Sequence, residues 1–346
     1  MMKKITFCGG GSAGHVMPNI AIYEDLKDKC DISYLGTPSI EKRICANFGV
    51  PFYEFDGVKL VRGKLLCNLG IPFKLIKSYR RCKEILAKIR PDLLFCKGGY
   101  VCLPAAYAAA SLGIPVLTHE SDMTAGLANK LIARKCERVL TTFPHTAKHF
   151  KNGVCTGSPM RKKLFFRDKL AAKAQLGLDL RPTILVFGGG SGSAKINAAL
   201  RDSLFHLCEK YNVLHLCGRG KAMDSHIDGY KQIEFSNDMG LIYACADYAV
   251  ARCGSNSANE LLALKIPTLF IPLKDGSRGD QIVNAQYFNS EGLCHVLDEK
   301  ELNPHTLTRA IENLIADDKL KAALNSCGVK CGNNNIEMEI ERIINR

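Results

Sequence analysis

The sequence predicts an α/β protein made of two Rossmann-like domains, and three observations lead to this fold class. Residues 5–29 and 182–208 each run from an apolar strand through a glycine-rich turn into a helix. Apolar strands alternate with helical segments, which is typical of parallel sheets covered by helices. At 346 residues the chain is also longer than one core usually supports. We expect a first domain at 1–158, a second at 159–330 and a C-terminal segment at 331–346.

Composition and charge narrow the class of protein. The sixteen cysteines are scattered and form no CxxC pair, so we expect the reduced thiols of a cytosolic protein. No apolar run approaches the roughly 20 residues of a membrane-spanning helix. The net charge of +13 indicates an acidic partner: a nucleic acid, an anionic lipid or a phosphorylated substrate.

The first strand, residues 5–8, leads through a glycine-rich turn to a helix at 19–29. Three glycines of the turn match G-x-G-x-x-G, and such a turn binds phosphate through its backbone N–H groups and those of the new helix. A dinucleotide site would also need an acidic residue after the next strand, but residues 31–35 lead into Gly-Thr. The sequence therefore predicts a phosphate-binding turn without NAD, with His15 at its rim.

Residues 59–90 form a basic stretch that carries ten Lys or Arg side chains and one acid, Glu84, interleaved with apolar residues. A Gly-Ile-Pro sequence at 70–72 is expected to break it. Such a surface can dip into an anionic bilayer without crossing it. An ordinary helix at 73–89 with a solvated basic side is the alternative. Because the apolar residues at 65–71 fit no single helical stripe, membrane contact is favoured.

Two further strands bring polar residues to one edge of the first sheet. The strand at 91–96 is followed by Lys-Gly-Gly-Tyr at 97–100, and the strand at 114–118 by His-Glu-Ser-Asp at 119–122. Ligands of open parallel sheets bind beyond the carboxyl ends of strands, so these loops and the first glycine turn can share one cleft. Helices are expected at 105–112 and 125–135, and another strand at 138–142.

The second half repeats the pattern. A second glycine loop at 188–193 precedes a helix at 196–208. Strands are expected at 182–187, 213–216, 232–235, 248–251 and 268–272.

Two polar loops in this half could bind a ligand. Glu260, at the start of a short helix, fits a helix cap and a carboxylate that binds sugar hydroxyls equally well. Asp280 and Gln281 suit hydroxyl recognition, with a solvated helix cap as the alternative. The last residues, 335–346, form an amphipathic helix that packs on the body of the protein.

Seven short motifs stand out along the chain. They are Gly-Gly-Gly-Ser-Ala-Gly-His at 9–15, Lys-Gly-Gly-Tyr-Val at 97–101, His-Glu-Ser-Asp at 119–122 with Gly-Leu-Ala-Asn-Lys at 126–130, Gly-Ser-Pro-Met-Arg at 157–161, the second glycine loop, Arg-Cys-Gly-Ser at 252–255 continuing to Asn259-Glu260, and Ser-Arg-Gly-Asp-Gln at 277–281 with Asn284-Ala285. In this order they resemble the MurG family of peptidoglycan glycosyltransferases, over essentially the whole chain.

The resemblance implies a GT-B fold, with two Rossmann-like domains facing across a cleft. The first domain would bind the acceptor and the membrane, the second would bind UDP-GlcNAc, and the C-terminal helix would return to the first. The implied activity is inverting transfer of GlcNAc from UDP-GlcNAc to the MurNAc of undecaprenyl-diphosphate-linked lipid I, giving lipid II. No obligatory cofactor and no nucleic acid are implied. The implied location is the cytoplasmic face of the bacterial membrane, with anionic lipids and other cell-wall synthesis and division proteins as partners.

The resemblance also assigns roles to residues. The acceptor diphosphate is expected at Gly11, Ser12, Gly98, Gly99 and Tyr100. The donor is expected at Ser12, Ala13, Gly14, Asp122, Arg161, Gly190, Ser191, Ser236, Ser255, Asn256, Ser257, Ala258, Asn259, Glu260, Asp280 and Gln281. Of these, Arg161 and the Gly190-Ser191 turn would meet the UDP phosphates, Ser236 the uracil, Glu260 the ribose, and Asp280 with Gln281 the GlcNAc hydroxyls.

Inverting transfer needs a base for the acceptor hydroxyl. His15 is the expected base, with a loop-orienting role as its alternative; Asp122 is the rival base and His119 a more distant one. No Asp-x-Asp motif in a suitable context is present, so no metal is expected. Two positions depart from the family: Asp122 stands where many members have Asn, and Gly190 where Ser is common. A hydroxyl contact to phosphate would then shift to Ser191 or be replaced by backbone N–H groups.

Other classes of protein explain fewer of these features. A basic scaffold for membranes or nucleic acid would account for the charge but not for two glycine turns. An NAD enzyme or epimerase would account for the turns but not for the missing acid after the second strand. A GT-B glycosyltransferase with another lipid acceptor, such as a diacylglycerol, is the alternative that stays open.

Overall fold

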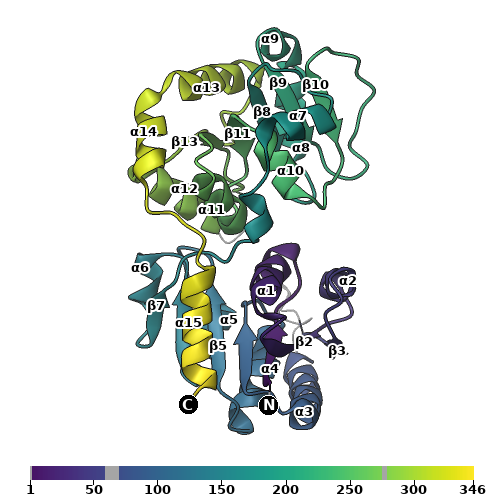
Figure 1. Ribbon diagram of the computed structural model, residues 1–346, viewed down its shortest axis with the longest axis vertical. Helices are drawn as coiled ribbons and strands as arrows, with labels where there is room; N and C mark the ends of the chain where they lie inside the picture. Colours follow the sequence, from purple (N-terminus) through teal and green to yellow (C-terminus); the bar gives the residue numbers. More distant parts are fainter. Residues whose placement is uncertain (1, 59–69, 275–278) are drawn as a thin grey trace. The chain divides into compact units, whose positions relative to one another are not determined.

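The computed structural model describes residues 2–58, 70–274 and 279–346, and it divides into two compact units (Figure 1). The first unit comprises Met1–Arg161 together with Cys331–Arg346, and the second comprises Lys162–Lys330. The amino-terminal part of the basic stretch, 59–69, lies outside the described residues, as do Ser277 and Arg278 of the last motif.

The first unit is a parallel sheet of seven strands in the order β3-β2-β1-β4-β5-β6-β7. The order reverses between β1 and β4, which is where open α/β sheets bind ligands. The strands are β1 (Lys3–Cys8), β2 (Cys30–Gly36), β3 (Phe52–Glu54), β4 (Leu93–Cys96), β5 (Val116–Glu120), β6 (Arg138–Thr141) and β7 (Gly153–Cys155). The helices are α1 (Ala13–Leu26), α2 (Ile40–Asn47), α3 (Ile71–Ile89), α4 (Cys102–Ser111), α5 (Leu127–Ile132) followed by the 3-10 turn η2 (Ala133–Lys135), α6 (Pro144–Ala147) and α15 (Asn333–Ile344).

The second unit repeats this architecture with six parallel strands in the order β10-β9-β8-β11-β12-β13. Its reversal point lies between β8 and β11. The strands are β8 (Thr183–Phe187), β9 (Asn212–Leu216), β10 (Tyr230–Ile233), β11 (Tyr248–Ala251), β12 (Thr268–Phe270) and β13 (His295–Val296). The helices are η3 (Lys162–Leu164), α7 (Lys169–Gln175), α8 (Ala194–Arg201), α9 (Leu204–Cys208), α10 (Met239–Cys245), α11 (Ser255–Ala263), α12 (Asp280–Ser290), α13 (Pro304–Ala316) and α14 (Asp318–Ser326). The fold class predicted from the sequence, two α/β domains with parallel sheets, is confirmed.

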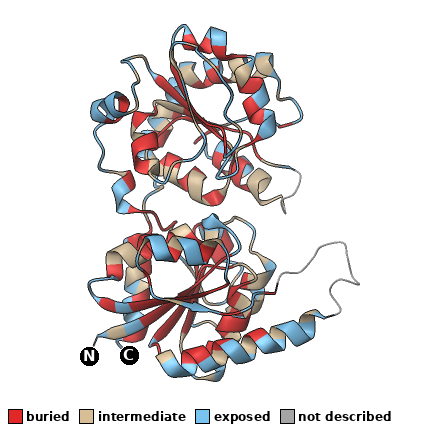
Figure 2. Cartoon of the chain, turned by 90° about the vertical axis from the view of Figure 1, so that its right-hand side faces the viewer, coloured by how far each residue is buried: buried red, intermediate tan, exposed pale blue. Residues whose placement is uncertain are grey.

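Both sheets are buried on their two faces, which explains why their central strands are apolar without alternation (Figure 2). In the first unit Phe7 of β1 and Phe95 of β4 are fully buried, and their rings meet edge to face at 5.5 Å. Strands β8 and β11 of the second unit are likewise buried along nearly their whole length.

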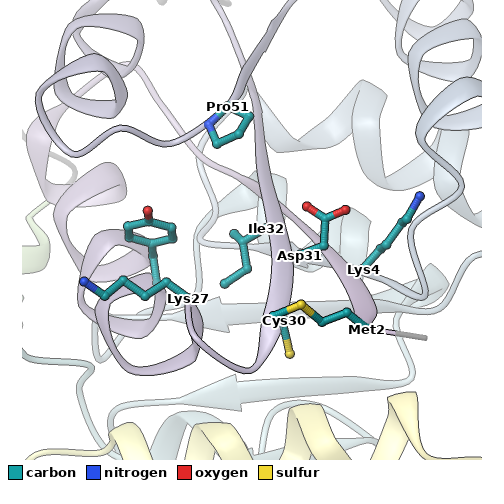
Figure 3. Close-up of a pocket in the computed structure, with 8 residues that line it drawn as sticks. Met2, Lys4, Lys27, Cys30, Asp31, Ile32 and Pro51 are labelled. Carbon is teal, nitrogen blue, oxygen red and sulfur yellow. The ribbon is translucent and has the colours of Figure 1, made fainter.

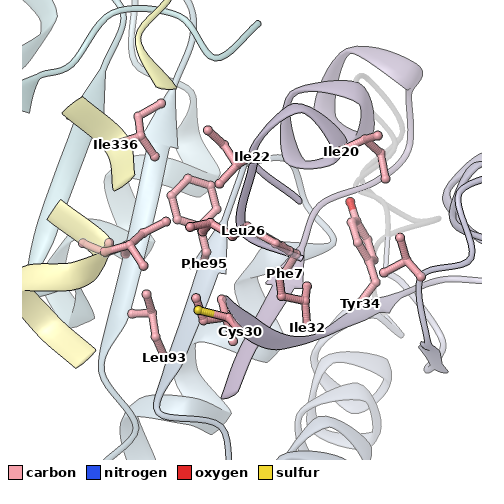
Figure 4. Close-up of a cluster of buried hydrophobic side chains, with 14 of the residues drawn as sticks. Phe7, Ile20, Ile22, Leu26, Cys30, Ile32, Tyr34, Leu93, Phe95 and Ile336 are labelled. Atoms are coloured by element: carbon pink, nitrogen blue, oxygen red, sulfur yellow. The ribbon is translucent and has the colours of Figure 1, made fainter. Parts of the chain in front are cut away.

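The C-terminal helix α15 completes the core of the first unit. Its apolar side carries Ile336 and Ile340, both fully buried, and Figure 4 shows Ile336 in one cluster with Phe95. Asn333, the first helical residue, accepts a hydrogen bond from Met160 N at 2.9 Å and donates to Asp25 Oδ2 at 2.6 Å. Residues more than 300 positions apart in the sequence therefore share one core.

Several helix boundaries differ from the sequence prediction. Helix α1 begins at Ala13 rather than at 19, because the buried Pro18 is accommodated inside the helix although it removes one hydrogen bond. The helix expected at 196–208 is two helices, and Ser203 at the junction donates its hydroxyl to the carbonyls of Ala199 and Pro304 at 2.9 and 3.1 Å. The three strands of two or three residues at the sheet edges were too short to give a period-2 signal.

The Gly-Ile-Pro sequence at 70–72 lies at the start of α3. Gly70 is the N-cap of α3 and Pro72 lies in its first turn, a position where proline is favourable because no N–H is required. The helix buries Cys82 and Leu86, whereas Phe73 and Ile76 are 79% and 50% exposed beside its basic residues.

Candidate active site

Three loops of the first unit meet at the carboxyl ends of β1, β4 and β5. The strand register pairs Cys8 with Cys96 and Cys96 with Thr118, so the loops that follow leave the sheet at one edge. Close approach of these loops requires glycine. A Cβ on Gly99, whose φ is +82°, would lie 3.2 Å from His15 Nδ1, and one on Gly11, at φ +79°, would lie 2.8 Å from the Tyr100 ring. The structure therefore brings together the predicted acceptor residues of two motifs.

His15 lies in the first turn of α1 and is half-buried. Its Nδ1 lies 3.1 Å from Gly10 O and 3.2 Å from Ser12 Oγ. A carbonyl oxygen can only accept, so the neutral ring carries its proton on Nδ1 and leaves the lone pair of Nε2 available. Burial, followed by the positive charge of Lys97, lowers the pKa of His15. The ring is therefore neutral at pH 7 and can accept a proton.

A buried carboxylate accepts a hydrogen bond from the first glycine turn. Glu41 of α2 is fully buried and accepts hydrogen bonds from Gly11 N at 3.3 Å and Thr37 N at 3.1 Å. The N–H of Gly11, which we expected at the acceptor diphosphate, is thus turned toward this carboxylate. Ser12, Ala13 and Gly14 at the start of α1 are exposed. No motif pointed to Glu41, because its partner lies 30 residues away in the sequence.

Glu120 shapes the turn after β5. One oxygen accepts from Asp122 N at 3.1 Å, and the other accepts from Gly126 N at 2.8 Å and from Asn129 Nδ2 at 2.9 Å. These bonds close the loop that carries Asp122, which is half-buried. Residues of the third motif, at 119–122 and 126–130, therefore build the loop itself.

His119, the more distant candidate base, is fully buried and its Nε2 donates to Gly157 O at 2.9 Å. Burial and the charge of Lys97 hold its pKa well below the usual range. Its ring is therefore a neutral part of the packing rather than a group exposed to a substrate.

In the second unit the glycine loop after β8 rests on the end of β9. A Cβ on Gly192, at φ +68°, would lie 2.0 Å from Cys217 O, so this contact needs glycine. Lys221 Nζ donates to Ser191 O at 2.8 Å, while Gly190 and Ser191 are themselves exposed at the tip. The loop therefore presents backbone groups at the sheet edge, where a phosphate can approach them.

Helix α11 starts at the same edge, because Phe187 of β8 pairs with Ala251 of β11. Glu260, on its second turn, accepts a hydrogen bond from the Tyr243 hydroxyl at 2.9 Å. Tyr243 is 3% exposed, so this bond fixes the direction of a half-buried carboxylate. The predicted helix-cap role of Glu260 is wrong, since it lies within α11 and not at its N-cap, which is Gly254.

The remaining members of the run 255–260 divide into two groups. Ser255, Ala258 and Asn259 are buried, and Asn259 Nδ2 donates to Ser255 O at 2.8 Å. Asn256 and Ser257 are half-buried in the first turn of α11. The first group therefore holds the helix start in place, and the second is accessible at the sheet edge.

The other expected donor residues lie on three different segments of the chain. Gln281 Oε1 accepts from Leu273 N at 3.0 Å, beside Asp280 at the start of α12. Ser236 Oγ accepts from Asp238 N at 3.1 Å in the loop after β10. Arg161 is 7% exposed and is the residue at which the first unit passes into the second.

A depression of about 580 Å³ lies at the opposite end of the first sheet (Figure 3). Its lining includes Lys4, Lys27, Cys30 and Ile32, near the amino ends of β1 and β2. None of the predicted site residues lines it. Within the described ranges, no group of three or more His, Cys, Asp or Glu side chains could hold a metal ion, and no helix is long and apolar enough to cross a membrane.

Known proteins share this fold, and some are similar in sequence. A crystal structure of Acinetobacter baumannii MurG superposes with a TM-score of 0.77 at 24% identity and covers 98% of this chain and 99% of that one. The calicheamicin glycosyltransferase CalG4 superposes with a TM-score of 0.74 at 14% identity, with 100% and 99% coverage. The fold is therefore that of the GT-B glycosyltransferases.

Sequence matches are more specific. Residues 5–141 match the glycosyltransferase family 28 N-terminal domain, and residues 183–335 match the family 28 C-terminal domain. The chain belongs to glycosyltransferase family 28. A Lachnospira eligens protein is 43% identical over 91% of this chain and 92% of its own length, and a Clostridium botulinum protein is 40% identical over 99% and 97%. Both are named UDP-N-acetylglucosamine--N-acetylmuramyl-(pentapeptide) pyrophosphoryl-undecaprenol N-acetylglucosamine transferase. The resemblance drawn from the motifs is thus confirmed.

Proposed function

We propose that this chain transfers GlcNAc from UDP-GlcNAc to the MurNAc of undecaprenyl-diphosphate-linked lipid I, giving lipid II for peptidoglycan synthesis. The observation that carries this proposal is the 40–43% identity to transferases of that name, over 91% and 99% of this chain. The enzyme is a glycosyltransferase, and its donor is a UDP-sugar that acts as a substrate rather than a cofactor.

The first unit supplies the acceptor side of the reaction in this proposal. The acceptor hydroxyl attacks the anomeric carbon of GlcNAc, the bond from that carbon to the UDP oxygen breaks, and the hydroxyl proton passes to a base. His15 suits this role because its Nε2 lone pair is available and its pKa is lowered. The rival base, Asp122, lies on the neighbouring loop. The exposed start of α1 and the Gly98 to Tyr100 loop are the groups proposed for the acceptor diphosphate.

The second unit supplies the donor side. In this proposal Glu260, directed by Tyr243, accepts hydrogen bonds from the ribose hydroxyls. The glycine loop after β8 and the start of α11 offer N–H groups to the diphosphate, on which negative charge accumulates as UDP leaves. Arg161, the last residue of the first unit before the second begins, adds a positive charge in this proposal. Asp280 with Gln281 binds the sugar.

The test measures transfer of labelled GlcNAc to a soluble short-chain lipid I analogue, with a diacylglycerol acceptor in parallel. We expect transfer to the lipid I analogue alone; transfer to the diacylglycerol alone would assign the chain to the alternative activity. His15→Ala should lower kcat by about 100-fold or more and leave UDP-GlcNAc binding nearly unchanged. The control is His149→Ala, an exposed histidine of the same unit.

The pH dependence separates the candidate bases. Because the pKa of His15 is lowered, its base form is lost only below pH 6.5, so kcat/KM should fall on the acid side of that value. A kcat for His15→Ala within threefold of wild type would remove His15 as the base and leave the role to Asp122.

We also propose that α3 contacts anionic lipids at the cytoplasmic face of the membrane. There, other cell-wall synthesis and division proteins would be partners of this protein. Phe73 and Ile76 are exposed on the same helix as the exposed Lys74, Lys77 and Arg81. Apolar and basic side chains together favour shallow insertion into an anionic surface. Charge reversal at the three basic positions should weaken binding to anionic vesicles in a salt-dependent way. Undiminished binding would show that this face is only solvated.

A further inference from the structure

Lys97 is a buried lysine in the loop after β4, the strand between β1 and β5, whose loops carry His15 and Asp122. It is the first residue after β4, its side chain is 2% exposed, and its backbone N–H donates to Cys8 O at 2.9 Å. Lysine is almost never fully buried unless its charge is paired, because removal of an ammonium group from water is costly. Groups close to Lys97 must therefore stabilise its buried positive charge.

The ammonium group is held by the turn after β5. Nζ donates to Ser121 Oγ, and the carboxylates of Glu120 and Asp122 stabilise the positive charge. Burial lowers the pKa of Lys97 to about 8, and the two carboxylates oppose that shift. The Lys97 ammonium group is therefore mostly protonated at pH 7, and it places a positive charge against the turn that carries Asp122.

The loop that begins at Lys97 approaches His15, because a Cβ on Gly99 would lie 3.2 Å from His15 Nδ1. The positive charge of Lys97 lowers the pKa of this ring. The groups that influence this imidazole come from all three loops of the site. They are Ser12 and Gly10 O on its own loop, Lys97 and Cys102 after β4, and Glu120 at the end of β5. Lys97 is the only one of these that carries a positive charge, and it disfavours a second positive charge on the ring.

We propose that Lys97 is a positioning residue for the transfer reaction: its buried ammonium group fixes the turn that carries Asp122 and keeps a positive charge beside His15. This inference rests on the proposed function, because His15 matters as a base only if the chain transfers a sugar to a hydroxyl. A purely packing role is disfavoured, because an apolar side chain of similar length would fill the space without burying a charge.

The experiment compares Lys97→Met, which removes the charge and keeps the length, with Lys97→Gln, which also retains a hydrogen-bond donor for Ser121. The matched control is Lys173→Met. Lys173 is 5% exposed in the second unit, and its Nζ donates to Arg181 O at 2.7 Å. Each protein is measured by NMR titration of His15, assigned with His15→Ala, and by steady-state kinetics with the lipid I analogue.

Both Lys97 variants should raise the pKa of His15 by about half a unit or more, and should move the acid limb of kcat/KM to higher pH by the same amount. Lys97→Met should lower kcat about tenfold or more, with KM for UDP-GlcNAc within twofold of wild type, because most of the expected donor residues lie in the second unit. Lys173→Met should leave the His15 titration and kcat unchanged.

Two results would overturn the inference. An unchanged His15 titration in both Lys97 variants would show that the charge of Lys97 does not reach the ring. A raised pKa with kcat equal to wild type would show that Lys97 plays no part in the reaction. Absence of transfer by the wild-type enzyme would instead refute the proposed function, and the NMR titration would still decide whether Lys97 acts on His15.

Discussion

Replacement of Ile340 by alanine should destabilise the first unit and leave the second unaffected. Ile340 is fully buried in the core cluster of the first unit, on the helix that packs against α1 and β4. The substitution removes three carbon atoms, worth about 2.4 kcal/mol at about 0.8 kcal/mol for each buried methylene. The cavity that remains raises the expected loss to about 3–4 kcal/mol.

The assay is hydrogen exchange measured by mass spectrometry, because it reports the two units separately. Amides of β1 and β4 should exchange about 100-fold faster or more in Ile340→Ala, whereas those of β8 and β11 should be unchanged. Leu314→Ala is the matched control. Leu314 is equally buried, but it lies in α13 of the second unit, so it should give the opposite pattern. Unchanged exchange in β1 and β4 of Ile340→Ala would refute the view that α15 stabilises the first unit.

Two further predictions concern the second unit. Tyr243→Phe removes the hydroxyl that directs Glu260, so the Kd for UDP-GlcNAc in calorimetry should rise about fivefold or more at nearly constant kcat; a Kd within twofold of wild type would contradict this. His215, buried between Tyr230 and Asn197, has its pKa lowered to about 4 by burial. Because the unfolded state then binds an extra proton below pH 6.5, stability should fall as the pH falls from 6.5 toward 4, by about 2 kcal/mol between pH 7 and pH 5. Urea unfolding at both pH values should show this loss in wild type and a smaller one in His215→Gln.

The sequence by itself determined the class of fold and the edge of each sheet where the glycine turns lie. Continuous apolar runs bounded by glycine or proline gave the central strands, because a parallel strand buried on both faces has no polar positions. The two glycine turns and the order of the motifs then led to the family, which the comparisons confirm. These signals are local in the sequence, so they can be recognised without knowledge of the contacts between helices and strands.

Only the tertiary structure decided which polar residues support the site. The carboxylate of Glu41 beneath Gly11 and the hydroxyl of Tyr243 on Glu260 are contacts between separate elements. Lys97 follows a strand in a glycine-rich loop, where a lysine is usually solvated, yet its side chain is 2% exposed.

The partners of the C-terminal helix also could not be predicted from the sequence. The spacing of its isoleucines predicted an apolar side, but a period of 3.6 residues does not say what covers that side. Its contacts with α1 and β4 join segments more than 200 residues apart. The free energy of such contacts depends on which surfaces meet once the whole chain has folded, and no local pattern contains that information.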